Sequence, residues 1–222
     1  MELFHALNRG VEKRDIFMDE RDRFRFVHGL LLFNTPRSAN NTTYLIENDN
    51  DFVSRYQESE RIVDLHAWCI MKNHYHLLLS ERVEGGLTLF LRKLNVGYAN
   101  YFNEKYRRSG SLFQGRTKKI GIHSNAHFLH ILHYIHLNPL DYLPGAREWR
   151  NGHVAETAKA KTHIDTYRWS SYADYCGKRN FPSLLTTKFF KDSIGNIEKE
   201  TLGYLGKSNG TLTDTIPARF LE

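Results

Sequence analysis

The pattern of hydrophobic and polar positions along the chain predicts a series of strands and helices. Short apolar runs rich in β-formers indicate strands, and apolar residues that recur at three- and four-residue spacing indicate amphipathic helices. The strands are expected at Leu3–Gly10, Arg61–Met71, His74–Ser80 and Leu112–Ile122. The helices are expected at Asp22–Leu32, Leu87–Tyr106 and Asn125–Asn138. This order of elements is typical of an α+β fold in which helices cover an antiparallel sheet.

Three polar segments interrupt this pattern. Residues 34–51 are rich in Asn, Ser, Thr and Asp, so we expect a surface loop there. Residues 145–163 predict an inserted helix or mobile connection over the active side, within a longer connection at 140–168. The tail after Asn196 is polar and is expected to be weakly ordered. We therefore expect one domain over residues 1–177 and a C-terminal extension at 178–222.

Two histidines stand one residue apart at the start of the third predicted strand, in Met71-Lys72-Asn73-His74-Tyr75-His76-Leu77-Leu78-Leu79. Residues two apart in a strand point to the same side, so His74 and His76 present their rings together while Tyr75 faces away. This arrangement suits one divalent metal ion. A half-buried, hydrogen-bonded structural pair is the alternative.

The last predicted helix carries a polar line on an otherwise apolar surface. Residues four apart share a helix face, which aligns His130, Tyr134 and Asn138, with His127 close beside them. Pro139 disfavours helical geometry at the preceding residue, so the helix should end near Asn138. A buried tyrosine with a satisfied hydroxyl is the structural alternative.

These two segments together suit phosphodiester transesterification. A phenol has an ordinary pKa of about 10 and needs a base, a metal ion or a cationic setting to act as a nucleophile. A metal ion held by two imidazoles and an amide oxygen can polarise a phosphate and stabilise the charge that builds on it. Asn138, one helical turn after Tyr134, would place ligand and nucleophile on one rigid element.

Five segments in order make the chain resemble the single-tyrosine HUH transposases, in particular the REP-associated tyrosine transposases. The resemblance covers about Leu3 to Gly177. The segments are Phe4-His5-Ala6-Leu7-Asn8-Arg9-Gly10, Met71 to Leu79 as quoted above, Gly110-Ser111-Leu112-Phe113-Gln114-Gly115-Arg116, Tyr134-Ile135-His136-Leu137-Asn138-Pro139 and Trp169-Ser170-Ser171-Tyr172.

The resemblance implies a ferredoxin-like antiparallel sheet of the HUH endonuclease type and a set of functional residues. It makes His74, His76 and Asn138 ligands of a divalent ion, Mg²⁺ or Mn²⁺, and Tyr134 the nucleophile. The tyrosine of such enzymes attacks single-stranded or hairpin DNA, becomes joined to the 5′ phosphate and releases a 3′ hydroxyl. A 3′ hydroxyl from another strand can then reverse the reaction.

The chain departs from the family pattern after Asn138-Pro139. The family usually continues with an arginine, a small residue and a glycine, whereas this chain has Leu140-Asp141-Tyr142. The connection to Trp169 is longer than usual, and residues 181–222 have no counterpart that aligns. These departures leave the chemistry in place and put the DNA target in question.

The distribution of charge favours a nucleic-acid partner. The net charge is +6, and between Gly85 and Ile120 there are eight cations and one carboxylate, interleaved with aromatic residues. The alternative is that the aromatics pack the core and the cations are solvated, and we expect Tyr98 and Phe102 to be core. The residues expected to contact DNA are Asn8, Arg9, Arg107, Arg108, Arg116 and Lys118; a plain surface role for Arg116 is an equal alternative.

Composition narrows the setting further. No signal peptide or membrane-length apolar run is present, so a cytoplasmic protein is expected, as a monomer or homodimer. Two cysteines, Cys69 and Cys176, make neither a disulfide scaffold nor a zinc cluster.

Three functions remain in order of preference. The first is metal-dependent DNA nicking and strand transfer through a 5′-phosphotyrosine, a transposase-like activity. The second is a domesticated protein that binds hairpin DNA without strand transfer. The third is a hydrolase with a zinc-bound water. It comes last because no Asp or Glu follows the histidine pair in the way that metalloprotease helices provide one.

Overall fold

The computed structural model describes residues 1–37, 60–151 and 154–206. Within these residues one antiparallel sheet forms from β1 (Leu3–Arg9), β2 (Val63–Ile70), β3 (His74–Glu81) and β4 (Lys118–Ile122). The strand order is β2-β3-β1-β4, with helix α1 (Glu20–Leu32) between β1 and β2 and helix α4 (Gly86–Lys105) between β3 and β4. This is the ferredoxin-like arrangement, and the predicted α+β fold with an antiparallel sheet is confirmed.

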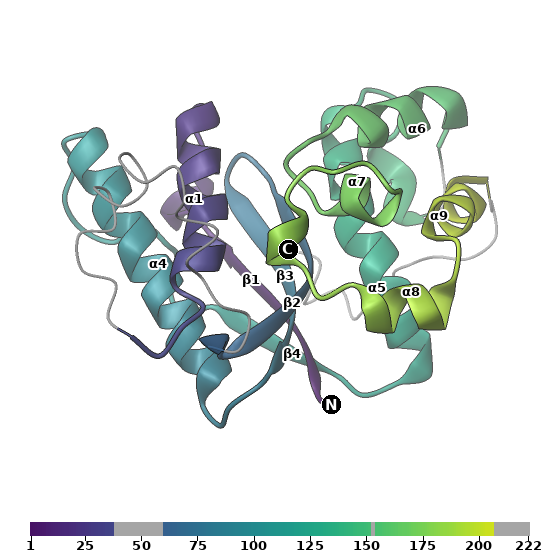
Figure 1. Ribbon diagram of the computed structural model, residues 1–222. Helices are drawn as coiled ribbons and strands as arrows, with labels where there is room; N and C mark the ends of the chain where they lie inside the picture. The colour runs from purple at the N-terminus through teal and green to yellow at the C-terminus, as the bar shows by residue number, and fades with distance from the viewer. Residues whose placement is uncertain (38–59, 152–153, 207–222) are drawn as a thin grey trace.

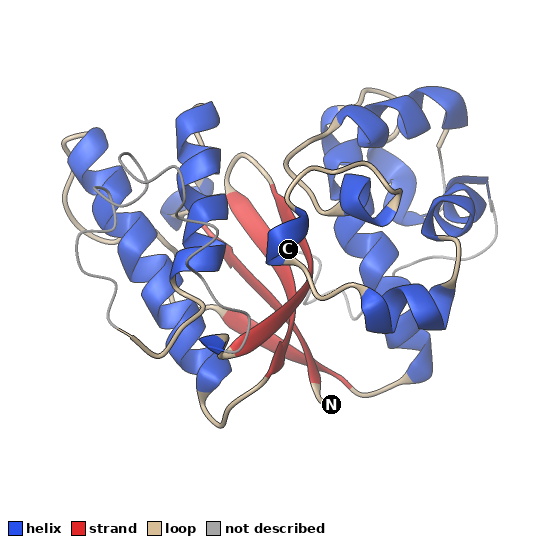
Figure 2. Cartoon of the chain, viewed as in Figure 1, coloured by secondary structure: helices blue, strands red, loops and turns tan. Residues whose placement is uncertain are grey.

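Helices α1 and α4 cover one face of the sheet (Figures 1 and 2). Asp19 begins α1 with a reciprocal capping box to Asp22, which satisfies backbone donors that the first turn leaves free. The first hydrophobic core lies beneath these helices and includes Tyr75, Tyr98 and Phe102. Tyr75 therefore faces away from the two histidines, and the placement of Tyr98 and Phe102 in the core is confirmed.

The opposite face of the sheet is covered by helix α5 (Asn125–Leu137) and the C-terminal helices (Figure 1). The C-terminal helices are α6 (Thr157–Thr166), α7 (Tyr172–Tyr175), α8 (Lys188–Ile194) and α9 (Ile197–Gly206). Ser124 caps α5 by accepting a hydrogen bond from the His127 amide. The second core includes Leu78 of β3 and Ile131 and Ile135 of α5.

The expectation that the tail after Asn196 is weakly ordered is wrong for residues 197–206. They form α9, whose Ile197 and Leu205 are buried in the second core. The mostly polar composition of the tail concealed these two apolar residues, which attach the helix to the core. Residues 207–222 and most of the expected loop at 34–51 lie outside the described residues.

Most predicted boundaries agree with the structure to within about two residues, and the start of β4 is the exception. Strand β4 begins at Lys118, six residues after the predicted start at Leu112, because Leu112 and Phe113 are buried in the first core from an irregular segment. Arg116 is therefore not on a strand. Helix α5 ends at Leu137, in agreement with the predicted end near Asn138, and the chain continues as the 3₁₀ turn η3 (Asn138–Tyr142), with Pro139 where a missing N–H is tolerated.

Three further 3₁₀ turns complete the described elements: η1 (Val11–Lys13), η4 (Arg147–Asn151) and η5 (Pro182–Leu184). Turn η4 lies in the connection that was expected to cover the active side, and α6 is the helix expected there. Trp149 of η4 is buried in the second core. The connection is thus packed against α5 rather than free of it.

Candidate active site

The two histidines of β3 point to the face of the sheet that α5 covers. Their rings meet edge to face with centroids 5.0 Å apart. The Nδ1 of His74 lies 2.6 Å from Oδ1 of Asn73, whose own amide group donates to the Lys13 carbonyl. Because an amide oxygen can only accept, His74 carries its proton on Nδ1 and leaves a lone pair on Nε2.

His5 of β1 stands directly behind His76. Nε2 of His5 lies 2.9 Å from Nδ1 of His76, and the rings are stacked with centroids 5.1 Å apart. If His76 donates from Nδ1 to His5, its Nε2 lone pair is free for a metal ion, as in sites where a neighbour fixes the tautomer of a ligand. Nε2 of His76 has no hydrogen-bond partner among the described residues.

All three imidazoles are held in the neutral form. Burial lowers the pKa of His5 to about 3, and burial with the nearby Arg9 cation lowers that of His74 to about 3. Burial and the neighbouring His74 lower the pKa of His76 well below its ordinary value. Neutral rings are what metal ligation requires.

Tyr134 projects from α5 onto this group of rings. Its ring lies 5.8 Å from His76 and 5.9 Å from His5, centroid to centroid. The residue is fully buried, and its hydroxyl makes no hydrogen bond of ordinary length among the described residues, with the Arg150 guanidinium close by. Burial raises the pKa of the phenol, and the adjacent Arg150 cation opposes that rise.

Asn138 lies one turn beyond Tyr134 and its amide is fixed at both ends. Its Nδ2 donates to the Tyr134 carbonyl at 2.8 Å, which turns Oδ1 toward Arg150, whose Nη2 donates to it at 2.9 Å. Both Nη atoms of Arg150 in turn donate hydrogen bonds to the carboxylate of Asp141. The amide oxygen keeps its second lone pair beyond the bond to Arg150.

The predicted metal ligands fit a divalent ion in their chemistry. Two neutral imidazoles, each with its Nδ1 next to a hydrogen-bonding neighbour, and an amide oxygen with a lone pair to spare form a mixed nitrogen and oxygen donor set. Among the described residues no group of three or more His, Cys, Asp or Glu side chains is arranged to hold a metal, so a site here depends on the amide.

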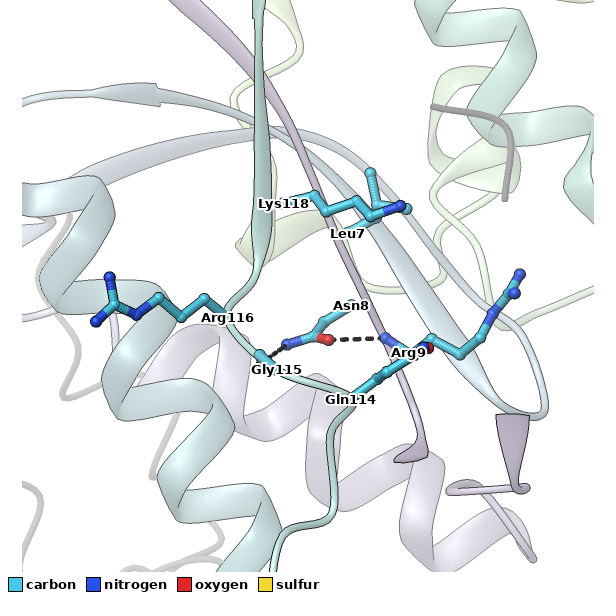
Figure 3. A pocket seen from close by; sticks show the side chains of 7 residues that line it. All are labelled: Leu7, Asn8, Arg9, Gln114, Gly115, Arg116 and Lys118. Atoms are coloured by element: carbon cyan, nitrogen blue, oxygen red, sulfur yellow. Dashed lines mark hydrogen bonds between the residues drawn. The ribbon is translucent and has the colours of Figure 1, made fainter. Parts of the chain in front are cut away.

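A cavity of about 210 Å³ lies along β1, the strand that pairs with the histidine-bearing β3. Arg9 pairs with His74, and Leu7 pairs with both His76 and Lys118, so these side chains share one face of the sheet. Figure 3 shows Arg9 and Lys118 extending to the same side. The cavity is lined by Leu7, Asn8, Arg9, Gln114, Gly115, Arg116 and Lys118, which include four of the six residues expected to contact DNA.

Asn8 shapes this cavity from within the fold. Its Nδ2 donates to the Gly115 carbonyl at 3.1 Å and its Oδ1 accepts from the Arg9 amide (Figure 3). Arg116 extends to the opposite side from Arg9, toward α4. Asn8 therefore fixes the shape of the cavity, and its own contact with DNA stays a prediction.

The remaining two predicted DNA contacts lie elsewhere. Arg107 is exposed in the turn after α4, and Arg108 donates to the Asn103 side chain and to the Ser111 carbonyl. Neither lines the cavity along β1. A role for this turn in DNA binding stays a prediction.

Sequence reasoning did not single out His5, Asp141, Trp149 or Arg150 as parts of the site. His5 lies within the first motif, and its same-face alternation with Arg9 was a usable signal. Arg150 comes from an irregular turn, where no periodicity predicts the direction of a side chain.

The comparisons with known proteins bear on this site directly. Residues 36–138 match the model of the family described as transposase IS200 like. Over these residues the chain resembles an IS200-like transposase. The resemblance inferred from the motifs is confirmed at this level, and the matched segment contains His74, His76, Tyr134 and Asn138.

Two further comparisons concern the chain as a whole. None of the curated proteins matches the chain in sequence. A solved structure described as a REP-associated tyrosine transposase bound to a REP hairpin superimposes with a TM-score of 0.47 at 12% identity, covering 84% of this chain and 86% of that one. Among the described residues no helix is long and apolar enough to cross a membrane.

Proposed function

We propose that this protein nicks and transfers DNA strands with Tyr134 as the nucleophile. The observation that carries the proposal is the convergence of Tyr134 with His76 and His5 from two different strands, at ring distances under about 6 Å. The family match supports a transposase-like protein, and the geometry of the described residues supports the finer assignment.

Each residue has a defined task in this proposal. His74, His76 and Asn138 hold a divalent ion, Mg²⁺ or Mn²⁺, which when bound polarises the scissile phosphate. The Tyr134 oxygen attacks phosphorus, the bond to the 3′ oxygen breaks, and the phenolic proton passes through solvent to the departing 3′ hydroxyl. The 5′ phosphate stays on the tyrosine, and a second 3′ hydroxyl can reverse the step.

The cationic cavity along β1 suits the DNA strand that leads into the site. Arg9 lies opposite His74 on β1, and Lys118 lies one strand further. A backbone that crosses this face meets both cations before it reaches the histidines. The partner is therefore single-stranded or hairpin DNA.

A second function is favoured by the closure of the site. Tyr134 is fully buried, with the Trp149 ring 5.7 Å from its own, so DNA reaches the hydroxyl only after the side chains that cover it move aside. A protein that never makes this movement would bind hairpin DNA without strand transfer.

The test uses hairpin oligonucleotides with single-stranded flanks, chosen from inverted repeats next to the gene and labelled at the 3′ end. With Mg²⁺ or Mn²⁺ the labelled fragment should become covalently attached to the protein and migrate with it in a denaturing gel. Tyr134→Phe should abolish the adduct. Tyr172→Phe is the matched control, because Tyr172 is also a fully buried tyrosine and lies outside the candidate site.

The outcomes separate the two functions. Loss of the adduct only in Tyr134→Phe supports strand transfer. Salt-sensitive hairpin binding without an adduct in the wild type supports the binding protein. An adduct that persists in Tyr134→Phe contradicts the assignment of the nucleophile.

A further inference from the structure

Arg150 lies in the candidate site but outside the segment that matches the transposase family, and it has no counterpart among the expected ligands. Its guanidinium carbon lies 5.7 Å from the centre of the Tyr134 ring. The same guanidinium donates to the amide oxygen of Asn138 at 2.9 Å. Arg150 thus contacts both Tyr134, the proposed nucleophile in α5, and Asn138, the proposed metal ligand at the start of η3.

The surroundings hold this cation in one place. Asp141 accepts from both Nη atoms, and the ring of Trp149 lies 4.3 Å beneath the guanidinium carbon. The Arg150 side chain is only 19% exposed. A rotamer-rich side chain fixed on three sides has lost its conformational freedom in the folded protein, which is how enzymes prepare charged groups for a transition state.

The hydrogen-bonding capacity of Arg150 is not exhausted. A guanidinium has five N–H donors, and the bonds to Asn138 and Asp141 use three of them. The Nε donor is buried and makes no hydrogen bond of ordinary length among the described residues, although the guanidinium is close enough to Tyr134 to oppose the rise that burial causes in the pKa of its phenol. A buried donor without a partner is costly unless a ligand supplies the acceptor.

The reaction supplies an acceptor with the right charge. When the Tyr134 oxygen adds to phosphorus, negative charge grows on the two non-bridging oxygens of the phosphate. Guanidinium groups match these oxygens in charge and in geometry.

We propose that Arg150 is a catalytic residue that donates hydrogen bonds to the non-bridging oxygens of the scissile phosphate during attack by Tyr134. The inference rests on the proposed function. Arg150 makes and breaks no covalent bond: the bond from the tyrosine oxygen to phosphorus forms, the bond from phosphorus to the 3′ oxygen breaks, and the guanidinium stays protonated throughout. Asp141 acts through Arg150 as a positioning residue.

The test compares two hairpin substrates that differ only at the scissile linkage. One carries the natural phosphodiester and the other a methylphosphonate, in which an uncharged methyl group replaces one non-bridging oxygen. If Arg150 neutralises phosphate charge, its loss should matter much less on the uncharged linkage. Arg150→Gln removes the charge and retains an amide donor for Asn138, Arg150→Lys retains the charge, and Lys159→Ala is the control at a cation 67% exposed on α6.

The expected result is a substrate-dependent defect. On the phosphodiester, Arg150→Gln should form the adduct about 100-fold or more slowly than the wild type, within the range for removing one preorganised donor. On the methylphosphonate the difference in rate between Arg150→Gln and the wild type should be less than about tenfold. Arg150→Lys should lie between Arg150→Gln and the wild type, and Lys159→Ala should match the wild type on both substrates.

Equal losses of Arg150→Gln on both substrates would overturn the proposal, because a misfolded or misaligned site slows both alike. Unchanged or faster cleavage by Arg150→Gln would overturn it as well. If Arg150→Gln unfolds, as judged by its circular dichroism melt, Arg150→Lys replaces it in the test. Its rate on the phosphodiester is divided by its rate on the methylphosphonate, and a value equal to that of the wild type contradicts the proposal. A wild type that forms no adduct with either substrate refutes the proposed function itself, which is a separate outcome.

Discussion

Replacing His5 with phenylalanine should weaken metal binding without removing any ligand. His5 Nε2 lies 2.9 Å from Nδ1 of His76, and both rings are buried. Phenylalanine can keep the ring stacking but cannot accept a proton from Nδ1. The buried N–H of His76 then has no acceptor, and the ring can escape only by moving its proton to Nε2, which is the atom required for the metal ion.

The size of the effect follows from that single hydrogen bond. Leaving a buried donor unsatisfied costs about 1–3 kcal/mol, which corresponds to a loss of affinity of about 5- to 150-fold. Partners of metal-binding histidines typically contribute about 10- to 100-fold to metal affinity. We therefore expect the dissociation constant for Mn²⁺ to rise by about 10- to 100-fold.

Isothermal titration calorimetry with Mn²⁺ at pH 7 measures this constant in the absence of DNA. His5→Gln is the matched variant, because its amide oxygen is able to accept from His76, and it should recover most of the affinity. The thermal melt of each variant shows that the fold is intact. A dissociation constant for His5→Phe within about twofold of the wild type, or an equal loss in His5→Gln, would refute the tautomer argument.

Three other perturbations test separate parts of the structure. Burial lowers the pKa of His136 to about 3, below the unfolded value of 6.5, so the folded protein loses stability as the pH falls below 6.5. Between pH 7 and pH 5 the free energy of unfolding, measured with urea, should fall by about 2 kcal/mol more for the wild type than for His136→Gln. Arg9→Ala should reduce the slope of log affinity against log salt for single-stranded DNA by about 0.7, and an unchanged slope would remove Arg9 from the interface. Gly97→Ala should destabilise by about 1–3 kcal/mol, because a Cβ there would lie 2.2 Å from the Phe33 ring, whereas Gly203→Ala meets nothing within 4 Å and should be neutral or stabilising.

The parts of the site that depend on local periodicity could be predicted from the sequence. His74 and His76 share a face because side chains alternate along a strand, and Tyr134 and Asn138 align because four residues make about one helical turn. Tyr75 is buried in the first core on the other side of the sheet, as the same alternation requires.

The parts that depend on which elements meet could not be predicted. His5 reaches His76 only because β1 pairs with β3, a contact between residues 71 positions apart. Arg150 reaches Asn138 because Asp141 binds it, and neither pattern nor propensity foretells a salt bridge within an irregular connection. Leu112 and Phe113 suggested a strand because burial in a core and burial in a sheet select the same apolar residues.

Peptide mapping by mass spectrometry shows directly whether Tyr134 attacks DNA. The wild type is incubated with Mn²⁺ and a cleavable hairpin, digested with nuclease and protease, and searched for a peptide that carries a nucleotide phosphate. We expect a single modified peptide, with the phosphate on Tyr134 and joined to the 5′ oxygen of the nucleotide. A phosphate on another tyrosine, or cleaved DNA with no modified peptide, would contradict it.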